Sequence, residues 1–376
     1  MKVLIKSKMG RLLDLALRLS VDKDNGAEIY FQSDNKEVGQ GFNDLQVCRE
    51  TKSKFDFIIE DKKENLELSC IKEDDVIKVV KKLSFLKKED ALNYAKENKG
   101  VYYIKQGGFR NFSRFENGID AIEIIRNFSE NEEIILSPRK FGVSLGILGF
   151  FNGSDFVVPL LVCFLQNRLL TKNFGSPCDS TGAVGLWAGT QSIFNKTTSK
   201  LVDGLRDKKY KGLVYCKVIA SEENIFITSV DLGFPVPEIY LLPEIMRTPL
   251  FRLLVAVEDY KEIEIYQHAG TVISVFLPNF PYDFCSYYKN IPLFGYGEQT
   301  KQHIHLNEVW KDKDNNVKCM GTSPYSVSAF GKMPKHSINL VYQFLRNVYV
   351  PNSFFRMDIG QFWFKNKELL SKWGLI

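Results

Sequence analysis

The stretch GLVYCKVIASEENIFITSVDLGFPVPE, residues 212–238, carries the strongest structural signal in the chain. Leu213, Tyr215, Lys217 and Ile219 alternate with Val214, Cys216 and Val218. A polar Glu-Glu-Asn group follows at 222–224, and β-branched and aromatic residues begin again at 225–230. This pattern predicts two strands joined by a turn. The second strand ends at Asp231 and runs into a loop that Gly and Pro stiffen. A carboxylate in that place is well suited to hold a metal ion and phosphates.

This pattern resembles the end of the ATP-grasp core in phosphoribosylamine–glycine ligase, also called glycinamide ribonucleotide synthetase. In that family a YxGxLYxGxM strand leads to a strand ending in EFN and then to an RFGDPE loop. Residues 210–215, YKGLVY, follow the first motif, and the loop keeps its Gly, its Pro and Glu238. Ser229 and Asp231 stand where the family has its Glu and Asn. The resemblance implies metal coordination by Asp231 and Ser229 and a substrate-side contact by Glu238.

Length and composition favour a globular protein of two or three units. The chain has 376 residues, 44% of them hydrophobic and 25% charged, and its net charge of +5 comes from 50 basic and 45 acidic residues. This small excess does not indicate nucleic acid and suits anionic small molecules. The seven scattered cysteines include no CxxC pair, which is typical of reduced cytosolic thiols. No apolar run approaches the roughly 20 residues of a membrane span, so we expect a cytoplasmic protein without a membrane partner.

The N-terminal residues predict a Rossmann-like unit, because a strand over 2–5 is followed by a Gly-containing turn and an apolar helix face beginning at Leu12. Gly10 and Arg11 stand at the GR of the family's VLVIGxGGRExAL motif, although a plain turn before a helix explains them as well. Residues 354–360, FFRMDIG, are close to the family's xxRxDIG. We expect a mixed α/β and α+β fold of three parts: an N-terminal Rossmann-like domain (1–70), an ATP-grasp core (71–260) and a C-terminal β-rich domain (261–376).

Residues 101–108, VYYIKQGG, resemble the family's VIKADG strand, whose Lys contacts the nucleotide phosphates. The resemblance implies the same phosphate role for Lys105. An unpaired buried ammonium is costly, so a strand that delivers one lysine into a cleft needs a functional reason. A solvent-facing position at a strand edge is the alternative for this residue. The charged stretch before it, residues 72–98, predicts a solvated helix.

The family continues with a flexible GLAAGKGV lid that closes over the phosphates, and here the same place holds FRNFSRF, residues 109–115. Arg110 and Arg114 are candidates to replace the backbone donors of that lid as phosphate ligands. A packed, inert loop is the alternative. Residues 137–142, SPRKFG, also replace the family's IEEFLDGEE, whose carboxylates hold the adenosine ribose. Both changes count against ordinary ATP binding.

Two further stretches resemble the substrate side of the family's site. Asn167 and Arg168 belong to a QNR sequence close to the family's QDHKR, and residues 180–185, STGAVG, resemble its NTGGMG. The resemblance implies substrate contacts by these two residues and by Thr181 and Gly182. Small residues let a backbone approach a phosphoribosyl or glycyl group, although a plain Gly-containing loop has the same composition.

The resemblance implies an ATP-dependent carboxylate–amine ligase that acts through an acyl phosphate, with ATP and Mg²⁺ as cofactors. Its substrates would be a glycine-like carboxylate and a phosphoribosylamine-like amine. A catalytically weakened or inactive ATP-grasp scaffold with a binding or structural role is one alternative, because lid, ribose and metal motifs are altered. A ligase with a changed acceptor, such as a modified nucleotide, is another. His303 and His305 alternate on a predicted strand without a third ligand nearby in the sequence, so they predict no metal site.

Overall fold

The computed structural model describes residues 2–22, 27–48, 54–61, 64–255, 264, 269–281 and 289–376. Its N-terminal unit is a four-stranded parallel sheet in the order β3-β2-β1-β4, with helix α1 packed against it. The elements are β1 (Lys2–Ser7), α1 (Leu13–Asp22), β2 (Glu28–Ser33), β3 (Gln46–Val47) and β4 (Phe57–Glu60). The predicted Rossmann-like opening is confirmed, since a strand, a turn at Gly10 and a helix follow in that order.

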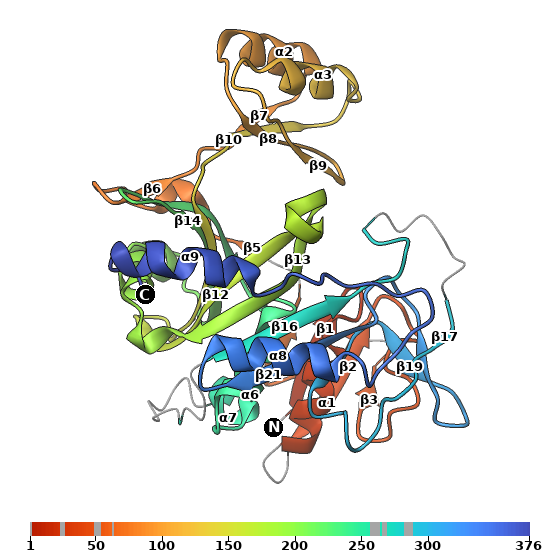
Figure 1. The fold of residues 1–376 in the computed structure, drawn as a ribbon. Helices are drawn as coiled ribbons and strands as arrows, with labels where there is room; N and C mark the ends of the chain where they lie inside the picture. The colour runs from red at the N-terminus through yellow and green to blue at the C-terminus, as the bar shows by residue number, and fades with distance from the viewer. Residues whose placement is uncertain are drawn as a thin grey trace.

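Residues 83–138 form a separate lobe, at the top of Figure 1, in which an antiparallel sheet carries two helices. The elements are β7 (Leu83–Phe85), α2 (Lys88–Glu97), β8 (Tyr102–Gln106), β9 (Phe109–Phe112), α3 (Ile119–Arg126) and β10 (Ile134–Pro138). Buried side chains such as Tyr102, Ile104 and Leu136 give the lobe a small core of its own. The strand order is β7-β10-β8-β9, so the β8–β9 hairpin stands at one edge.

The helix predicted over residues 72–98 is wrong in its first half. Only α2, Lys88–Glu97, is helical, and the residues before it contain β6 (Ile77–Val79) and β7. Strand β6 runs parallel to β15 (Ile225–Leu232), and the next amide, that of Val80, donates to the Ile227 carbonyl over 2.9 Å. Short β-branched runs that find a partner strand adopt the sheet conformation, and this pairing outweighs the helix-like spacing of the charges.

The body of the molecule is built on a ten-stranded sheet that contains the predicted hairpin. Its order is β18-β21-β16-β13-β12-β11-β14-β15-β5, with β6 paired to β15. The remaining strands are β5 (Glu64–Asn65), β11 (Val143–Phe151), β12 (Phe156–Leu170), β13 (Phe174–Trp187), β14 (Gly212–Ala220), β16 (Ala269–Val275), β18 (Ile304–Leu306) and β21 (Tyr325–Gly331). Strands β14 and β15 pair antiparallel, as predicted. Because β5 and β16 belong to the same sheet, it crosses the boundaries predicted at residues 70 and 260.

Each face of this sheet packs into its own core. In β14, Leu213 and Tyr215 join one core, while Val214, Cys216 and Val218 join the other. The first core also takes in the N-terminal unit and side chains of α6 (Leu242–Ile245), α7 (Leu250–Val255) and α8 (Pro334–Phe344). The second is covered by α4 (Ser192–Thr198), α5 (Val202–Asp207) and α9 (Gln361–Lys372). Alternate residues of one strand therefore hold two layers together.

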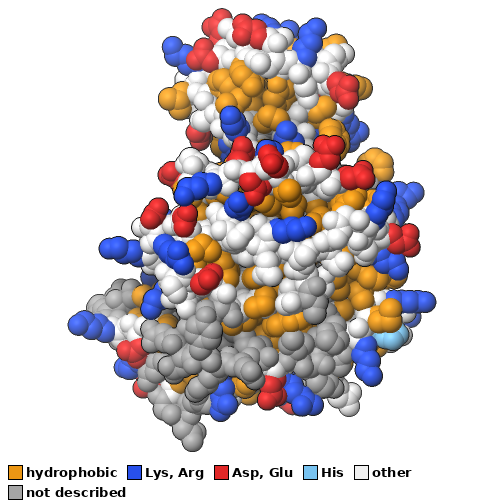
Figure 2. Space-filling view, turned by 90° about the vertical axis from the view of Figure 1, so that its left-hand side faces the viewer, with side chains coloured by type: hydrophobic (Ala, Val, Ile, Leu, Met, Phe, Trp, Pro, Cys, Tyr) orange, Lys and Arg blue, Asp and Glu red, His pale blue; other side chains and the backbone are white. Residues whose placement is uncertain are grey.

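Figure 1 shows the lobe standing above the body, with the β8–β9 hairpin turned toward the end of β13. In the space-filling view a narrower waist joins the two parts, and charged side chains of both signs gather there (Figure 2). A three-stranded sheet of β17 (Ile291–Pro292), β19 (Val309–Lys311) and β20 (Val317–Cys319) lies at the side of the body. Single 3-10 turns occupy Leu68–Cys70, Thr171–Asn173, Ala188–Thr190 and Glu238–Leu241. Within the described residues, no helix is long and apolar enough to cross a membrane.

Candidate active site between the lobe and the body

Asp231 and Lys217 form an ion pair on the central hairpin. Asp231 is the last residue but one of β15, its side chain is only 9% exposed, and Lys217 Nζ lies 3.3 Å from its Oδ2 atom. The strand register fixes this pair, because Lys217 stands opposite Ser229 and Tyr215 opposite Asp231. Diagonal neighbours on one face of antiparallel strands are within reach of long side chains. The carboxylate that the resemblance assigns to a metal therefore contacts an ammonium group.

Two more lysines approach this pair. Lys82 lies on the link between β6 of the body and β7 of the lobe, and Lys105 lies in β8. The pKa of Lys82 is lowered because part of its hydration is lost; Asp231 opposes this shift, and the positive charges of Lys105 and Lys217 add to it. We call Lys82, Lys105 and Lys217 the lysine cluster. Lys82 is within electrostatic reach of both other members, and the positive charge of the cluster favours a polyanion.

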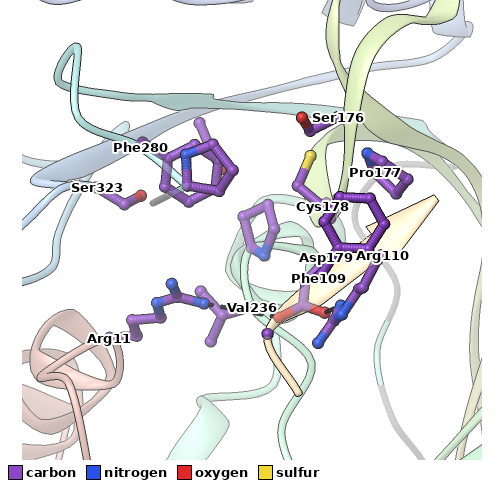
Figure 3. A pocket seen from close by; sticks show the side chains of 15 residues that line it. Arg11, Phe109, Arg110, Ser176, Pro177, Cys178, Asp179, Val236, Phe280 and Ser323 are labelled. Atoms are coloured by element: carbon purple, nitrogen blue, oxygen red, sulfur yellow. Dashed lines mark hydrogen bonds and ion pairs between the residues drawn. The ribbon is translucent and has the colours of Figure 1, made fainter. Parts of the chain in front are cut away.

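A cavity of about 220 Å³ lies where the lobe, the N-terminal unit and the body meet (Figure 3). Arg110, which pairs with Lys105 across the β8–β9 hairpin, places Nη1 2.9 Å from Asp179 Oδ1. Arg11 reaches in from the turn before α1, with Nη1 4.0 Å from Asp179 Oδ2 and Nε 3.4 Å from Glu308 Oε1. The lining residues are Arg11, Gly108, Phe109, Arg110, Ser176, Pro177, Cys178, Asp179, Ser180, Val236, Pro237, Ser274, Phe280, Pro281 and Ser323.

Tyr103 connects the cavity to the lysine cluster. Its pKa is raised, chiefly because the phenol is buried; Arg110 and Lys217 act to lower it, and Asp179 acts to raise it. One side chain is thus within electrostatic reach of both Arg110 in the cavity wall and Lys217 in the cluster. Tyr103 therefore lies near residues of both the cavity wall and the cluster.

Two buried polar atoms of this region have no hydrogen-bond partner among the described residues. They are Oγ of Ser180, which lines the cavity, and Oδ1 of Asn167 in β12. Gln166 pairs with Gly182 and Arg168 pairs with Pro177, so Asn167 lies across from residues 178–181 of β13, which include Ser180. Buried polar atoms are nearly always satisfied, so an open hydroxyl in a cavity wall is suited to a bound molecule.

Thr181, Gly182 and Glu238 are buried behind the cavity wall. The Thr181 hydroxyl donates to the Gln166 carbonyl oxygen over 3.0 Å, and a Cβ on Gly182 would lie 2.5 Å from the Val272 carbonyl oxygen. Glu238 begins a 3-10 turn and is 2% exposed, while the two residues before it line the cavity. These contacts hold the wall in place. The substrate contacts expected of the three residues stay predictions.

Arg114 is separated from Arg110, although both are candidate phosphate ligands by their place in the sequence. It belongs to a second basic group with Arg139 and Arg168. The pKa values of Arg139 and Arg168 are lowered, first by burial and then by the neighbouring arginines. Arg168 lies 4.7 Å and Arg139 5.3 Å from the centroid of the Phe112 ring. Because Arg139 lies in the SPRKFG segment, a cation stands where the related family has ribose-binding carboxylates.

No model of a known protein family matches the chain, but two curated proteins are similar to part of it. Phosphoribosylamine–glycine ligases from two strains of Leptospira interrogans are 27% identical to it over 248 residues, or 62% of this chain. The match takes in 56% of those ligases, so the chain spans about half the length of the curated relatives it matches. Among solved structures, the phosphoribosylamine–glycine ligase of Thermotoga maritima has a TM-score of 0.72 at 15% identity, covering 96% of this chain and 100% of that one.

Two nucleotide-bound structures share the same fold. The ADP complex of N5-carboxyaminoimidazole synthetase from Staphylococcus aureus has a TM-score of 0.55 at 9% identity, covering 92% of this chain and 97% of that one. The biotin carboxylase domain of 2-oxoglutarate carboxylase from Hydrogenobacter thermophilus, solved with ADP, its magnesium salt and bicarbonate, has a TM-score of 0.60 at 11% identity, covering 98% and 95%. The chain shares the fold of these enzymes. Its predicted fold class and its resemblance to phosphoribosylamine–glycine ligase are confirmed.

The donor set at Asp231 and Ser229 does not fit Mg²⁺. Mg²⁺ takes a near-octahedral set of oxygen ligands and is usually held by one or two carboxylates. Here Asp231 is already in contact with Lys217, and Ser229 offers a hydroxyl in place of a carboxylate. In the described part of the chain, no group of three or more His, Cys, Asp or Glu side chains is arranged to hold a metal ion. Metal coordination by Asp231 and Ser229 stays a prediction, and this arrangement does not favour it.

Several residues of the candidate site could not be predicted from the sequence. Arg11 lies in the GR motif but is explained equally well there by a turn, and Asp179 directly precedes the STGAVG segment. Lys82 falls in the stretch predicted as a solvated helix. The available signal for Lys217 was its place in the alternation of β14, which puts it on the same face as Tyr215.

Proposed function

We propose that this chain is an ATP-grasp protein and an ATP-dependent carboxylate–amine ligase of the phosphoribosylamine–glycine ligase type. The observation that supports the proposal most is the lysine cluster beside a cavity lined by Arg11, Arg110 and Ser180. Nucleotide phosphates held by the lysines would face a small anionic substrate in the cavity, because Lys105 and Arg110 are cross-strand partners in one hairpin. Two of these groups, Arg11 and Ser180, come from different units, so the site depends on the whole fold.

In the proposed reaction, a carboxylate oxygen of a glycine-like substrate attacks the γ-phosphorus of ATP, and the bond to the β-phosphate oxygen breaks to release ADP. The amine of a phosphoribosylamine-like substrate then attacks the acyl phosphate carbon. Inorganic phosphate leaves, and the nitrogen gives up a proton as the amide forms. None of these steps needs a nucleophile from the protein, whose part is positioning and charge neutralisation.

The described residues divide this work between two places. We assign Lys105 and Lys217 to the phosphates, and Arg110 with Arg11 to the carboxylate, because their shared partner Asp179 holds the two guanidinium groups at the cavity wall. Asn167 and Arg168 are assigned to the amine substrate. The open polar atom of Asn167 supports its assignment.

Weak turnover is expected, because the adenosine side of the site is altered. The SPRKFG segment supplies Arg139 instead of ribose-binding carboxylates, and the FRNFSRF hairpin is bulkier than a glycine-rich lid. Losing one charge-assisted contact costs roughly 1.5–3 kcal/mol, so losing several moves ATP binding from micromolar toward millimolar. The same changes favour the second candidate, a scaffold that binds ligands without catalysis. A ligase with a different acceptor is the third.

The assay is product formation from phosphoribosylamine, glycine and ATP, run beside an authentic synthetase, together with thermal shift in ATP and ADP. We expect a nucleotide-induced rise in Tm and turnover well below that of the control enzyme. A turnover number within about tenfold of the control would contradict the expected weakness, since tenfold is only 1.4 kcal/mol. If neither turnover nor a nucleotide-induced rise in Tm is observed, the ligase proposal is wrong and the non-catalytic scaffold is favoured.

A further inference from the structure

Lys217 occupies the position at which a bound cation would meet Asp231. The ammonium lies 3.3 Å from the carboxylate, and the exposed fractions of the two side chains are 22% and 9%. Both residues lie on paired antiparallel strands, whose backbones keep the two side chains close together. The Lys217 ammonium also lies 5.8 Å from the centroid of the Tyr215 ring, which supports it from the neighbouring position on the same strand.

The charges around this pair repel a divalent cation. Lys82 is within electrostatic reach of Lys217, Lys105 and Asp231, and the Lys217 ammonium lies against the Asp231 carboxylate. A Mg²⁺ ion entering here would meet the positive charges of Lys82 and Lys217 and a carboxylate already in contact with an ammonium. A phosphate chain would meet the opposite balance, because three ammonium groups can donate to its oxygens.

We propose that the Lys217 ammonium, held in place by Asp231, does the work of a metal ion here, so that the lysine cluster binds a polyphosphate chain without divalent metal. Asp231 is then a positioning residue that orients Lys217 and is not a metal ligand. The inference rests on the proposed function only for the identity of the anion as a nucleotide polyphosphate. The cluster itself would take any linear di- or triphosphate.

The test is calorimetric titration of inorganic tripolyphosphate into the full chain, first in EDTA and then in excess Mg²⁺. We expect binding in EDTA, with no gain in affinity when Mg²⁺ is added. Lys217→Met should weaken binding in EDTA at least tenfold, whereas Lys217→Arg, which keeps the charge, should stay within about threefold of wild type. The matched control is Lys318→Met, because Lys318 lies 3.5 Å from Asp312 in another ion pair of similar exposure, on β20 outside the cleft.

Asp231→Asn separates the two roles of this carboxylate. If Asp231 only positions Lys217, the variant gains net positive charge, and tripolyphosphate binding in EDTA is kept or strengthened. Tripolyphosphate binding that needs Mg²⁺ in the wild type and disappears in Asp231→Asn would overturn the inference and leave the ligase proposal intact. Metal-free binding together with absent ligase turnover would support the inference and contradict the ligase. No tripolyphosphate binding in either condition would overturn the inference.

Discussion

Nδ1 of His305 lies 2.8 Å from Oδ2 of Asp14, and this contact joins strand β18 of the ten-stranded sheet to helix α1 of the N-terminal unit. Asp14 also accepts a hydrogen bond from Arg18 Nε over 2.5 Å, and His305 Nε2 lies 2.5 Å from the Ser328 hydroxyl. The imidazole is fully buried and stacks on Tyr240, with ring centroids 4.3 Å apart. The network fixes the N-terminal unit, and with it one wall of the cavity, against the sheet.

Acid should destabilise the fold through this network. Burial first, and then Arg18, lower the pKa of His305 below its ordinary 6.5, so the folded chain keeps the ring neutral at a pH where the unfolded chain protonates it. The unfolded state then binds more protons. The contribution of His305 to the free energy of unfolding is therefore complete above pH 6.5 and falls as the pH drops below that value, by at most about 1.4 kcal/mol per pH unit.

Profiles of Tm against pH for the wild type and two variants check this expectation. His305→Gln should be less stable near neutral pH but show a flatter profile between about pH 7 and 5. His336→Gln, at an exposed position, should keep the wild-type slope. Equal slopes for His305→Gln and the wild type would show that the acid sensitivity arises elsewhere.

Removing the Arg110 guanidinium should impair substrate binding in the cavity. Its contact with Asp179 orients both side chains, and a charge-assisted hydrogen bond to a substrate is worth roughly 1.5–3 kcal/mol. Arg110→Met should therefore raise the KM for the carboxylate substrate by about tenfold or more. The control is Arg126→Met, because Arg126 forms an exposed ion pair with Glu123 on α3. An unchanged KM in Arg110→Met would remove Arg110 from the substrate site.

Gly182→Ala should destabilise the sheet itself. The added Cβ would lie 2.5 Å from the Val272 carbonyl oxygen, where β13 and β16 pair, and the backbone φ of +152° suits glycine. Overpacking of this kind costs typically about 1–3 kcal/mol, to be read from denaturant unfolding. Gly297→Ala, where an added Cβ meets nothing within 4 Å, should change stability little. A stable Gly182→Ala with an increased KM would instead favour a direct substrate role.

Arg356→Met should be among the most destabilising substitutions in the chain. The Arg356 side chain is 1% exposed, with Nη2 2.8 Å from Asp358 Oδ2 and Nη1 donating to the Arg168 carbonyl over 2.9 Å. Breaking a buried ion pair from one side costs about 3–5 kcal/mol, measurable by chemical denaturation. Lys372→Met, which removes an exposed pair with Glu222 at 3.9 Å, should cost less than about 1 kcal/mol. Equal losses in the two variants would contradict this interpretation of the FFRMDIG motif.

The elements predicted correctly are those whose residue pattern depends only on neighbours in the sequence. The 212–232 hairpin and the strand that carries Lys105 follow from alternation within a few residues, and both are confirmed. The first half of the helix predicted over 72–98 is wrong, because β6 depends on a partner strand about 150 positions away in the sequence. Helix α9 was not anticipated. Its buried residues Trp363 and Leu370 pack into the second core of the sheet, and the sequence of the helix alone does not show this contact.

The same distinction applies to the site. Lys105 and Arg110 could be named because they lie in a motif, whereas the significance of Lys217 comes from the carboxylate opposite it on another strand. Arg11 and Asp179 meet at the cavity only because the N-terminal unit packs against the sheet. Contacts between distant segments set these roles, and single-residue patterns do not show them.

Calorimetric titration of ATP into the wild type and Lys105→Met decides whether the lysine cluster holds nucleotide phosphates. We expect a wild-type Kd between roughly 0.1 and 5 mM, weakened at least tenfold in Lys105→Met. Lys332→Met, at an exposed position outside the cleft, should leave the Kd unchanged. ATP binding that is equally tight in Lys105→Met and the wild type would contradict the claim.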